Sequence, residues 1–252
     1  MKCPLWLVAV TLLLGMPFEA RSQLPAMCSL VPFKSGLAAS LSGAAAATPK
    51  QYSGIVHESL PRFYFSIHEA NTEESNGAKR ITSIKIRSER KLVQIIRFED
   101  DDDAPIDFAP GDLVTLEDVD CDGYKDLLVR NFVGVHGDAW YHLYRFDPAK
   151  RQFVEYGPFI DLAYTGVDCR TKVVKTYENN GAAGCIYEAG WYRWINGELL
   201  PVRVESQDGG VNGSFLRTIT VWPDGNAIVL STQAVPLDDC HVPNKPADKH
   251  KE

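Results

Sequence analysis

The sequence lacks an excess of positive charge and, beyond its first residues, any long apolar run. Its 26 Lys and Arg residues are outnumbered by 33 Asp and Glu residues, which gives a formal net charge of −7 at pH 7. Because phosphate backbones are bound by basic surfaces, this balance argues against nucleic acid as a partner. A membrane-spanning helix needs about 20 apolar residues. We therefore also expect no membrane anchor.

The N-terminal apolar run, from Pro4 to Gly15, is too short to span a bilayer. One lysine precedes it, and the small residues Ala20 and Ser22 follow it. This order is typical of a cleavable secretory signal peptide. We assign residues 1–22 to a signal peptide and expect the mature protein to be periplasmic.

The rest of the chain divides by composition. Residues 23–50 are rich in Ala, Gly and Ser and predict a flexible N-terminal segment, with an Ala-rich helix as the alternative. Residues 51–240 are expected to form a single domain, and residues 241–252 a polar C-terminal tail. The acidic run at residues 99–103 is interpreted as a solvated loop, with a second cation site as the alternative.

Amphipathic helical periodicity is also lacking. Apolar and polar residues instead alternate with a period of two, as in "ITSIKIRS", "WYHLYRF" and "FLRTITVW". Asn196-Gly197 and Pro223-Asp224-Gly225 are hairpin turn signals between such segments. About ten strands joined by short turns predict an all-β fold. We expect an antiparallel meander, arranged as a β-sandwich or a small propeller-like array.

The chain contains six cysteines, five of them after residue 22. In an oxidising compartment some of these five should pair, and the odd number leaves at least one free. We expect the disulfides Cys169–Cys185 and Cys28–Cys240, with Cys121 as a buried thiol. One sequence does not fix this connectivity.

The stretch "DVDCDGYKD", residues 118–126, gathers four aspartates around one glycine. Its spacing fits positions 1, 3, 5, 7 and 9 of a calcium loop, with glycine at position 6 for the sharp turn. Hard oxygen ligands in this number predict Ca²⁺. The expected ligands are the side chains of Asp118, Asp120, Asp122 and Asp126 and the carbonyl oxygen of Tyr124.

Position 12 of this loop is Val129, where an EF-hand needs a glutamate, and the loop leads into a strand-like segment. It therefore resembles the calcium loops of FG-GAP-type β repeats. The alternatives are an Asp/Gly-rich turn without metal and a pair of catalytic carboxyls that hydrolyse glycosides. Because ligands committed to calcium are poor proton donors, we expect a structural site.

A nucleophile motif is lacking as well. His136 and Asp138 in "VGVHGDAW" could pair as a base, but no Gly-x-Ser-x-Gly elbow accompanies them. We therefore expect that the protein is not an enzyme. The same loop, with Trp140, is a candidate partner-binding surface. The alternating aromatics of "WYRW", residues 191–194, predict core packing, with carbohydrate stacking as the alternative.

Three consecutive stretches carry a larger resemblance, which covers about residues 80–205. They are "DVDCDGYKDLLV", "VGVHGDAWYHLYRFDPAKRQFVEYGPF" and "VDCRTKVVKTYENNGAAGCIYEAGWYRWINGELLPV". In this order they resemble the periplasmic inhibitors of invertebrate-type lysozyme. They also resemble the related immunity proteins against peptidoglycan hydrolase effectors of type IV secretion systems.

The resemblance implies an inhibitory Ser-Gly-x-x-Tyr loop that enters the substrate cleft of the target enzyme. The matching stretch here is residues 183–187, in which Gly184 and Tyr187 match and Ala183 replaces the serine. A tyrosine suits such a role because it offers a large rigid ring and a hydroxyl. An ordinary strand position for Tyr187 is the alternative.

The leading hypothesis is a non-catalytic, calcium-binding periplasmic inhibitor or immunity protein that blocks the cleft of a lysozyme-like peptidoglycan hydrolase. The alternative is a calcium-dependent carbohydrate-binding or adhesion module. The sequence leaves open the identity of the target, the oligomeric state and the effect of Ala183 on potency, because specificity depends on the loop shape and charge of both partners.

Overall fold

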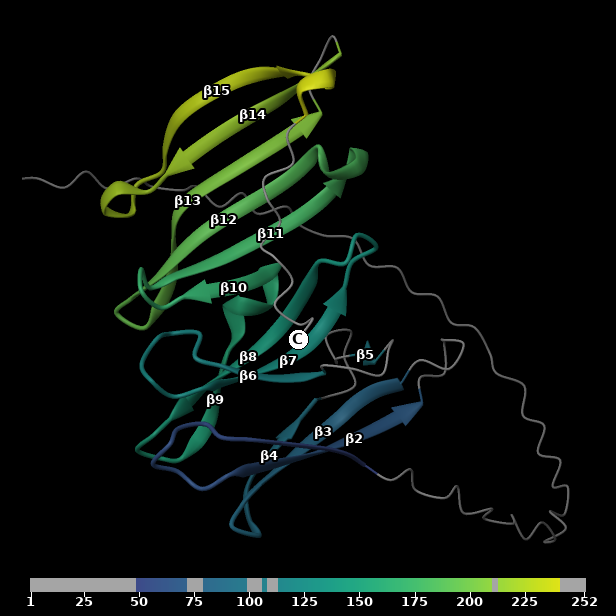
Figure 1. Cartoon of the computed structure of the whole chain (residues 1–252), viewed down its shortest axis with the longest axis vertical. Coiled ribbons are helices and arrows are strands. Elements are labelled where there is room, and N and C mark those ends of the chain that lie inside the picture. Colours follow the sequence, from purple (N-terminus) through teal and green to yellow (C-terminus); the bar gives the residue numbers. More distant parts are fainter. Residues whose placement is uncertain (1–48, 72–78, 99–105, 108–112, 210–212, 241–252) are drawn as a thin grey trace, which may run out of the picture. The chain divides into compact units, whose positions relative to one another are not determined.

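The computed structural model describes residues 49–71, 79–98, 106–107, 113–209 and 213–240 (Figure 1). The chain divides into two units, residues 1–45 and residues 46–252, and all described residues belong to the second unit. The predicted signal peptide, the acidic run 99–103, the C-terminal tail and most of the segment 23–50 lie outside the described residues.

Fifteen β-strands and four short 3-10 turns make up the secondary structure of the described residues, among which no α-helix occurs. Every strand pairing is antiparallel. The strands form three sheets in which neighbours mostly follow one another along the chain (Figure 1). The predicted all-β antiparallel meander is therefore confirmed.

The first sheet has the order β1-β2-β3-β4, and β5 also pairs with β3. Its strands are β1 (Lys50–Gly54), β2 (Phe63–Asn71), β3 (Lys79–Ser88), β4 (Lys91–Arg97) and β5 (Ile106–Asp107). The second sheet consists, in this order, of β6 (Val114–Glu117), β7 (Asp126–Val133), β8 (Ala139–Asp147) and β9 (Gln152–Tyr156). The third consists, in this order, of β10 (Tyr164–Asp168), β11 (Val173–Gly181), β12 (Ile186–Ile195), β13 (Glu198–Gly209), β14 (Ser214–Val221) and β15 (Ile228–Pro236).

The second sheet supplies side chains to two separate hydrophobic cores. Leu127 on β7 belongs to a buried cluster that includes Phe63 and Ile84 of the first sheet. Its neighbour Leu128 belongs to a different cluster, which includes Val174 of the third sheet. Because adjacent strand residues project to opposite faces, both faces of β7 are covered. Sheets that pack face to face in this way are the layers of a β-sandwich.

Two hairpin turns follow the residue types that the sequence provides. Asn196 and Gly197, between β12 and β13, have φ values of 53° and 86°. A two-residue type I′ turn requires positive φ at both central positions, and Asn-Gly meets this requirement at low cost. Asp224 and Gly225 likewise have positive φ, in the turn that leads to β15. The turn chemistry predicted from sequence therefore sets these connections.

The expected disulfide pairing is wrong. Cys121 pairs with Cys169, and Cys185 pairs with Cys240, with Cα–Cα distances of 5.3 and 5.6 Å. Cys169 lies in the turn before β11, whereas Cys185 follows its last residue. Nine residues of extended strand cover about 30 Å, so these two cysteines lie at opposite ends of β11 and cannot meet. Cys28, the expected partner of Cys240, lies outside the described residues.

Candidate functional site

The aspartate loop connects β6 to β7 and brings three of its four aspartates together. Carboxylate oxygens of Asp118, Asp120 and Asp126 all lie within 4.8 Å of one another. Gly123, at the sixth loop position, has φ of 96°, which a residue with a side chain adopts only with strain. The glycine predicted to allow the sharp turn therefore occupies the position where the backbone requires it.

Backbone amides hold all three carboxylates in place, and Asp120 accepts one such bond of 3.3 Å from the N–H of Asp122. Asp118 accepts hydrogen bonds from the N–H groups of Asp122 (3.1 Å) and Gly123 (3.0 Å). Asp126 accepts from the N–H groups of Val119 (3.0 Å) and Phe146 (2.9 Å). Each oxygen has a second lone pair, so these bonds fix the orientation of the carboxylates and leave coordination capacity.

Asp126 is the most deeply buried aspartate of the loop, with 1% of its surface exposed. The pKa of this carboxyl is raised to about 7, mainly by burial and also by the charges of Asp120 and Asp122, against the hydrogen bonds from Phe146 and Val119 that lower it. A buried carboxylate among other carboxylates is costly unless a cation compensates it. The loop therefore favours a bound positive charge.

One such charge comes from a residue that sequence reasoning missed. Arg145, on β8, forms an ion pair with Asp120, and its Nε lies 2.7 Å from Oδ2. The guanidinium also stacks over the ring of Trp194, 4.7 Å from the centroid. No local signal marks Arg145, because it lies 25 residues after Asp120 and meets it only through the pairing of β7 with β8.

The three gathered carboxylates fit a calcium ion. Calcium binds oxygen ligands at about 2.3–2.6 Å, so two ligands on opposite sides of one ion lie at most about 5 Å apart. The 4.8 Å spread of Asp118, Asp120 and Asp126 satisfies this limit. One charge from Arg145 cannot neutralise all the carboxylates of the loop, and an ion would add two more.

Of the other two expected ligands, Asp122 lies outside the gathered group, and the carbonyl of Tyr124 stays a prediction. Oδ1 of Asp122 accepts a hydrogen bond of 2.8 Å from the N–H of Tyr124. The ring of Tyr124 stacks on Phe146, with 5.7 Å between centroids, and approaches His57. Asp122 therefore shapes the turn in this structure, while Tyr124 anchors it to the first hydrophobic core.

The disulfide Cys121–Cys169 attaches the middle of the aspartate loop to the turn between β10 and β11. Cys121 has a φ of 57°, a conformation unusual for a residue with a side chain. The loop is thus fixed at both ends by strands and at its centre by a covalent bond. Such a loop needs little reorganisation to bind an ion.

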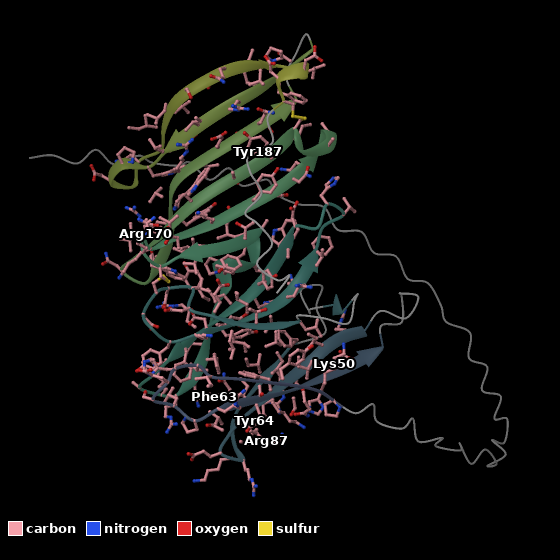
Figure 2. All side chains as sticks on the ribbon, viewed as in Figure 1. Lys50, Phe63, Tyr64, Arg87, Arg170 and Tyr187 are labelled. Atoms are coloured by element: carbon pink, nitrogen blue, oxygen red, sulfur yellow. A yellow bond between two sulfur atoms is a disulfide. The ribbon has the colours of Figure 1, made fainter. Side chains whose placement is uncertain are left out.

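Tyr187 does not project towards a partner as expected. Tyr187 lies within the third sheet (Figure 2) and is 1% exposed. Its ring stacks on that of Tyr177, with 5.9 Å between centroids. Its hydroxyl donates a hydrogen bond of 2.8 Å to Oε1 of Glu205 on β13. The expectation of a projecting tyrosine is therefore wrong, because the strand register of β12 places Tyr187 on the covered face, where the resemblance alone gave no information about burial.

Two other candidate segments meet in space. Oδ2 of Asp138, in the β7–β8 hairpin loop, accepts a hydrogen bond of 2.7 Å from the N–H of Asn179, near the end of β11. Asp138 is 6% exposed and Asn179 is half-buried, so this charge-assisted bond is partly shielded from water. The bond joins residues 132–140 to residues 179–185. These two segments together are called the hairpin rim.

The outer residues of the hairpin rim are exposed. Val135 is 95% exposed at the tip of the β7–β8 loop, beside the exposed His136. Phe132 is 48% exposed, and its ring packs against Trp140 with 5.5 Å between centroids. Of the predicted partner-binding residues, His136 is therefore accessible, Trp140 is half-buried, and Asp138 has a structural role.

The second part of the rim has an unusual backbone. Gly181, Ala182, Ala183 and Gly184 all have positive φ, and the two alanines are exposed. Non-glycine residues held in this region cost of order 1–3 kcal/mol each, and such strain often occurs at functional sites. The segment ends at Cys185, which is bonded to Cys240 and whose carbonyl accepts a hydrogen bond from Gln207. This segment is therefore rigidly held.

The aromatic residues of β12 pack against buried clusters. Tyr192 and Trp194 contact the core between the second and third sheets. Trp191 packs against the cluster around Tyr187 and lies under the guanidinium of Arg203, 5.1 Å from its ring centroid. These contacts agree with the expectation of core packing for residues 191–194.

The described residues thus define a disulfide-bonded, three-sheet antiparallel β protein with an aspartate loop and a rigid hairpin rim. Two disulfides are typical of an oxidising, extracytoplasmic compartment. Among the described residues, no helix has the length and apolar character needed to cross a membrane.

No protein-family model matches this chain, and no curated protein matches it. Among solved structures, a Xanthomonas protein described as related to a type IV secretion system has a similar fold. The TM-score is 0.53 and the sequence identity 18%, over 74% of this chain and 98% of that chain. At this identity the similarity establishes the fold alone.

Proposed function

We propose that this chain is a periplasmic inhibitor or immunity protein that uses its hairpin rim to block the cleft of a lysozyme-like peptidoglycan hydrolase. The observation that carries the proposal is the partly buried hydrogen bond between the N–H of Asn179 and Asp138, which makes one rigid edge from two loops. A rigid edge with exposed apolar and small residues loses little entropy when it enters a concave site.

Two further observations support this proposal. The similar Xanthomonas structure is described as related to a type IV secretion system, which agrees with the resemblance to immunity proteins against effectors of such systems. The burial of Tyr187 moves the proposed contact from the tyrosine to the exposed residues Val135, His136 and Ala183. Ala183 stands where the lysozyme inhibitors that the sequence resembles have a serine. In this proposal its side chain contributes to the shape of the contact surface but forms no hydrogen bond.

Calcium has a structural role in this proposal. Asp118, Asp120 and Asp126 would hold the ion, which supplies positive charge that neutralises their carboxylates. The loop leads directly into β7, and β7 ends in the hairpin rim. Fixing the start of β7 therefore supports the position of the rim without any chemical step at the metal.

The test is inhibition of peptidoglycan lysis, measured as turbidity with a panel of invertebrate-type lysozymes and secretion-system hydrolases. Val135→Asp and His136→Ala change exposed rim residues, so they should weaken inhibition of the sensitive enzyme by at least about tenfold without lowering the melting temperature. Val154→Asp, at a position on β9 that is 47% exposed, is the matched control and should inhibit like the parent.

Two outcomes of this experiment would contradict the proposal. If no hydrolase of the panel is inhibited or bound by the parent protein, the inhibitor function is overturned. If a hydrolase is inhibited but the rim variants are as potent as the Val154→Asp control, the inhibitory surface lies elsewhere, and the rim assignment is overturned.

A further inference from the structure

The first sheet has an outer side that faces away from its hydrophobic core. Alternate residues of a strand project to opposite faces, and Phe63 and Ile86 of β2 and β3 are buried in the core shared with the second sheet. Tyr64 and Arg87 follow them in sequence and pair directly across the two strands (Figure 2). They therefore lie on the outer side, where Tyr64 is 46% exposed and Arg87 is also exposed.

Positively charged side chains gather on this outer side, and together they are called the basic face. Lys85 lies two residues before Arg87 on β3, and Arg97 on β4 pairs with Ser83 of the same strand. Arg62, just before β2, donates a hydrogen bond of 3.3 Å to Oγ of Ser53, which pairs with Tyr64. The basic face thus consists of Arg62, Lys85, Arg87 and Arg97. The other outward residues where β2, β3 and β4 pair are Ser, Tyr, His, Leu and Ile, so no acidic side chain lies among them.

The charges of the basic face are not compensated by described residues. None of its four cations forms an ion pair within the described part of the chain. Their effect reaches the neighbouring His68, whose pKa is lowered by partial loss of hydration and then by the charges of Lys85 and Arg87. A protein with a net charge of −7 therefore carries a positive surface on one sheet. Such a surface attracts anions locally although the whole chain is acidic.

We propose that the basic face binds peptidoglycan through the free carboxylates of its peptide stems. Strand residues two positions apart, such as Lys85 and Arg87, are separated by about 7 Å. The four cations therefore extend over a larger area than one small anion covers, and they match a polymer with repeated anionic groups. Three of the four are arginines, whose planar guanidinium groups pair with carboxylates in bidentate fashion.

The other residues of this side favour a polymer of sugars and peptides over a lipid surface. Oγ of Ser66 accepts a hydrogen bond of 3.4 Å from Nη1 of Arg87 and donates one of 3.1 Å to Oε1 of Gln51. These polar groups orient the guanidinium and offer further hydrogen bonds to a polar ligand. The exposed Tyr64 adds a flat ring with a hydroxyl, which suits a sugar. Proteins that lie on membranes bury a broad apolar face, whereas Leu92 is the one exposed aliphatic side chain among these outward residues.

The choice of peptidoglycan as the polyanion rests on the proposed function and on the extracytoplasmic compartment that the two disulfides indicate. An inhibitor held on the cell wall has a high local concentration where a hydrolase meets its substrate. The basic face belongs to the first sheet, whereas the hairpin rim is formed by strands of the second and third sheets. Binding to the wall therefore uses residues other than those proposed to contact the hydrolase.

The experiment is co-sedimentation of the purified mature protein with insoluble peptidoglycan, without a hydrolase. We expect the parent protein to pellet with the polymer and the bound fraction to fall as salt screens the charges. Arg87→Glu combined with Arg97→Glu should weaken binding by at least about tenfold. Both residues are exposed, so the melting temperature should stay near that of the parent. Lys175→Glu combined with Arg193→Glu makes the same change in net charge at exposed positions of the third sheet and should bind like the parent.

Chemical modification of the polymer identifies the group that is recognised. Peptidoglycan whose carboxylates are amidated with carbodiimide and ethanolamine should no longer bind, whereas peptidoglycan with acetylated amino groups should bind as before. Vesicles of equal parts phosphatidylglycerol and phosphatidylcholine test a lipid surface and should bind at least tenfold more weakly than peptidoglycan.

The proposal is overturned if the parent protein does not pellet, or if the Arg87/Arg97 variant pellets as well as the Lys175/Arg193 control. It is also overturned if amidation of the polymer has no effect or if the vesicles bind better than peptidoglycan. Inhibition of a hydrolase on a soluble substrate is measured separately. A protein that binds peptidoglycan but inhibits no hydrolase would contradict the inhibitor function alone, and an inhibitor that does not bind peptidoglycan would contradict this proposal alone.

Discussion

Arg145 and Asp120 form an ion pair that holds the aspartate loop against the second sheet. The Asp120 side chain is 4% exposed, whereas that of Arg145 is 33% exposed and rests on Trp194. The protein therefore supplies one positive charge of its own to a loop that also favours a metal ion. The two cations stabilise the same carboxylates, so their contributions to stability should be coupled.

Arg145→Met should destabilise the calcium-free protein by about 2 kcal/mol, the usual contribution of a hydrogen bond to a charged group. The stabilisation gained on adding calcium should become larger than in the parent, because the carboxylates are then less compensated. Thermal melts with chelator and with calcium measure both effects. Arg170→Met removes an arginine whose side chain is 85% exposed and is the matched control, with a change below about 1 kcal/mol.

Calcium should raise the melting temperature of the parent protein, and a chelator should lower it. A free concentration one hundred times the dissociation constant stabilises the native state by about 2.7 kcal/mol. Asp118→Asn should abolish most of this response, since Asp118 belongs to the gathered carboxylates. Isothermal titration of the parent with calcium should give one site. Melting that is indifferent to calcium and chelator contradicts the site.

Tyr187→Ala should cost the fold about 3–5 kcal/mol, the usual range for removing a large buried aromatic ring. Tyr187→Phe keeps the packing on Tyr177 and removes only the hydrogen bond to Glu205, so its cost should be about 1 kcal/mol. Tyr64, on β2, is 46% exposed, and Tyr64→Ala serves as the control with a smaller loss. Urea unfolding measures all three. A folded Tyr187→Ala of parental stability would restore the idea of a projecting side chain.

Glu188 lies directly opposite Glu178 in the pairing of β12 with β11. Partial loss of hydration, followed by the charges of Glu178 and Asp208, raises the pKa of Glu188 above its usual value. The folded state therefore binds this proton more tightly than the unfolded state, so the associated stability is present at low pH and is lost as pH rises through the folded pKa.

Glu188→Gln should consequently raise the free energy of unfolding at pH 7, by less than about 1 kcal/mol because solvent screens this exposed position. The advantage over the parent should shrink on acidification towards the usual carboxyl pKa. Unfolding curves at several pH values measure it. Glu198→Gln, at an exposed position on β13, is the matched control variant. An equal gain at all pH values would contradict the assignment to titration of Glu188.

Peptide mapping without reduction should find Cys121 joined to Cys169 and Cys185 joined to Cys240. Each disulfide closes a loop, with sequence separations of 48 and 55 residues, and should stabilise the fold by about 4 kcal/mol. Replacing both Cys121 and Cys169 by serine should also weaken calcium binding, because the loop loses its central attachment. A peptide that links Cys169 to Cys185 would refute the structure of this region.

The sequence predicts the fold better than it predicts the site. Period-two patterns and turn residues are local, and Asn196-Gly197 forms the expected hairpin because both its residues accept positive φ. The division into three sheets was not predictable, because it depends on which strands share a core. The continuous apolar run in β7, Leu127–Val129, is the one local sign of a strand covered on both faces.

Contacts that depend on how the strands pair could not be predicted from the sequence. Asp118, Asp120 and Asp126 were identifiable because their spacing within one loop sets their geometry. Arg145, in contrast, reaches them from another strand. The bond between Asp138 and Asn179 likewise joins segments 41 residues apart. The disulfide pairs were predicted wrongly for the same reason, since the length of β11 separates Cys169 from Cys185.

The disulfide between Cys185 and Cys240 also determines how the protein responds to mechanical tension. A force applied at the C-terminal end would pass from Cys240 through the sulfur–sulfur bond to Cys185, so β12 to β15 would carry none of it. The bypassed chain, with a sequence separation of 55 residues, would add about 190 Å of extension if it were free to unravel. A fusion partner pulled at this end would therefore load β11 first and leave the edge strand β15 unstretched.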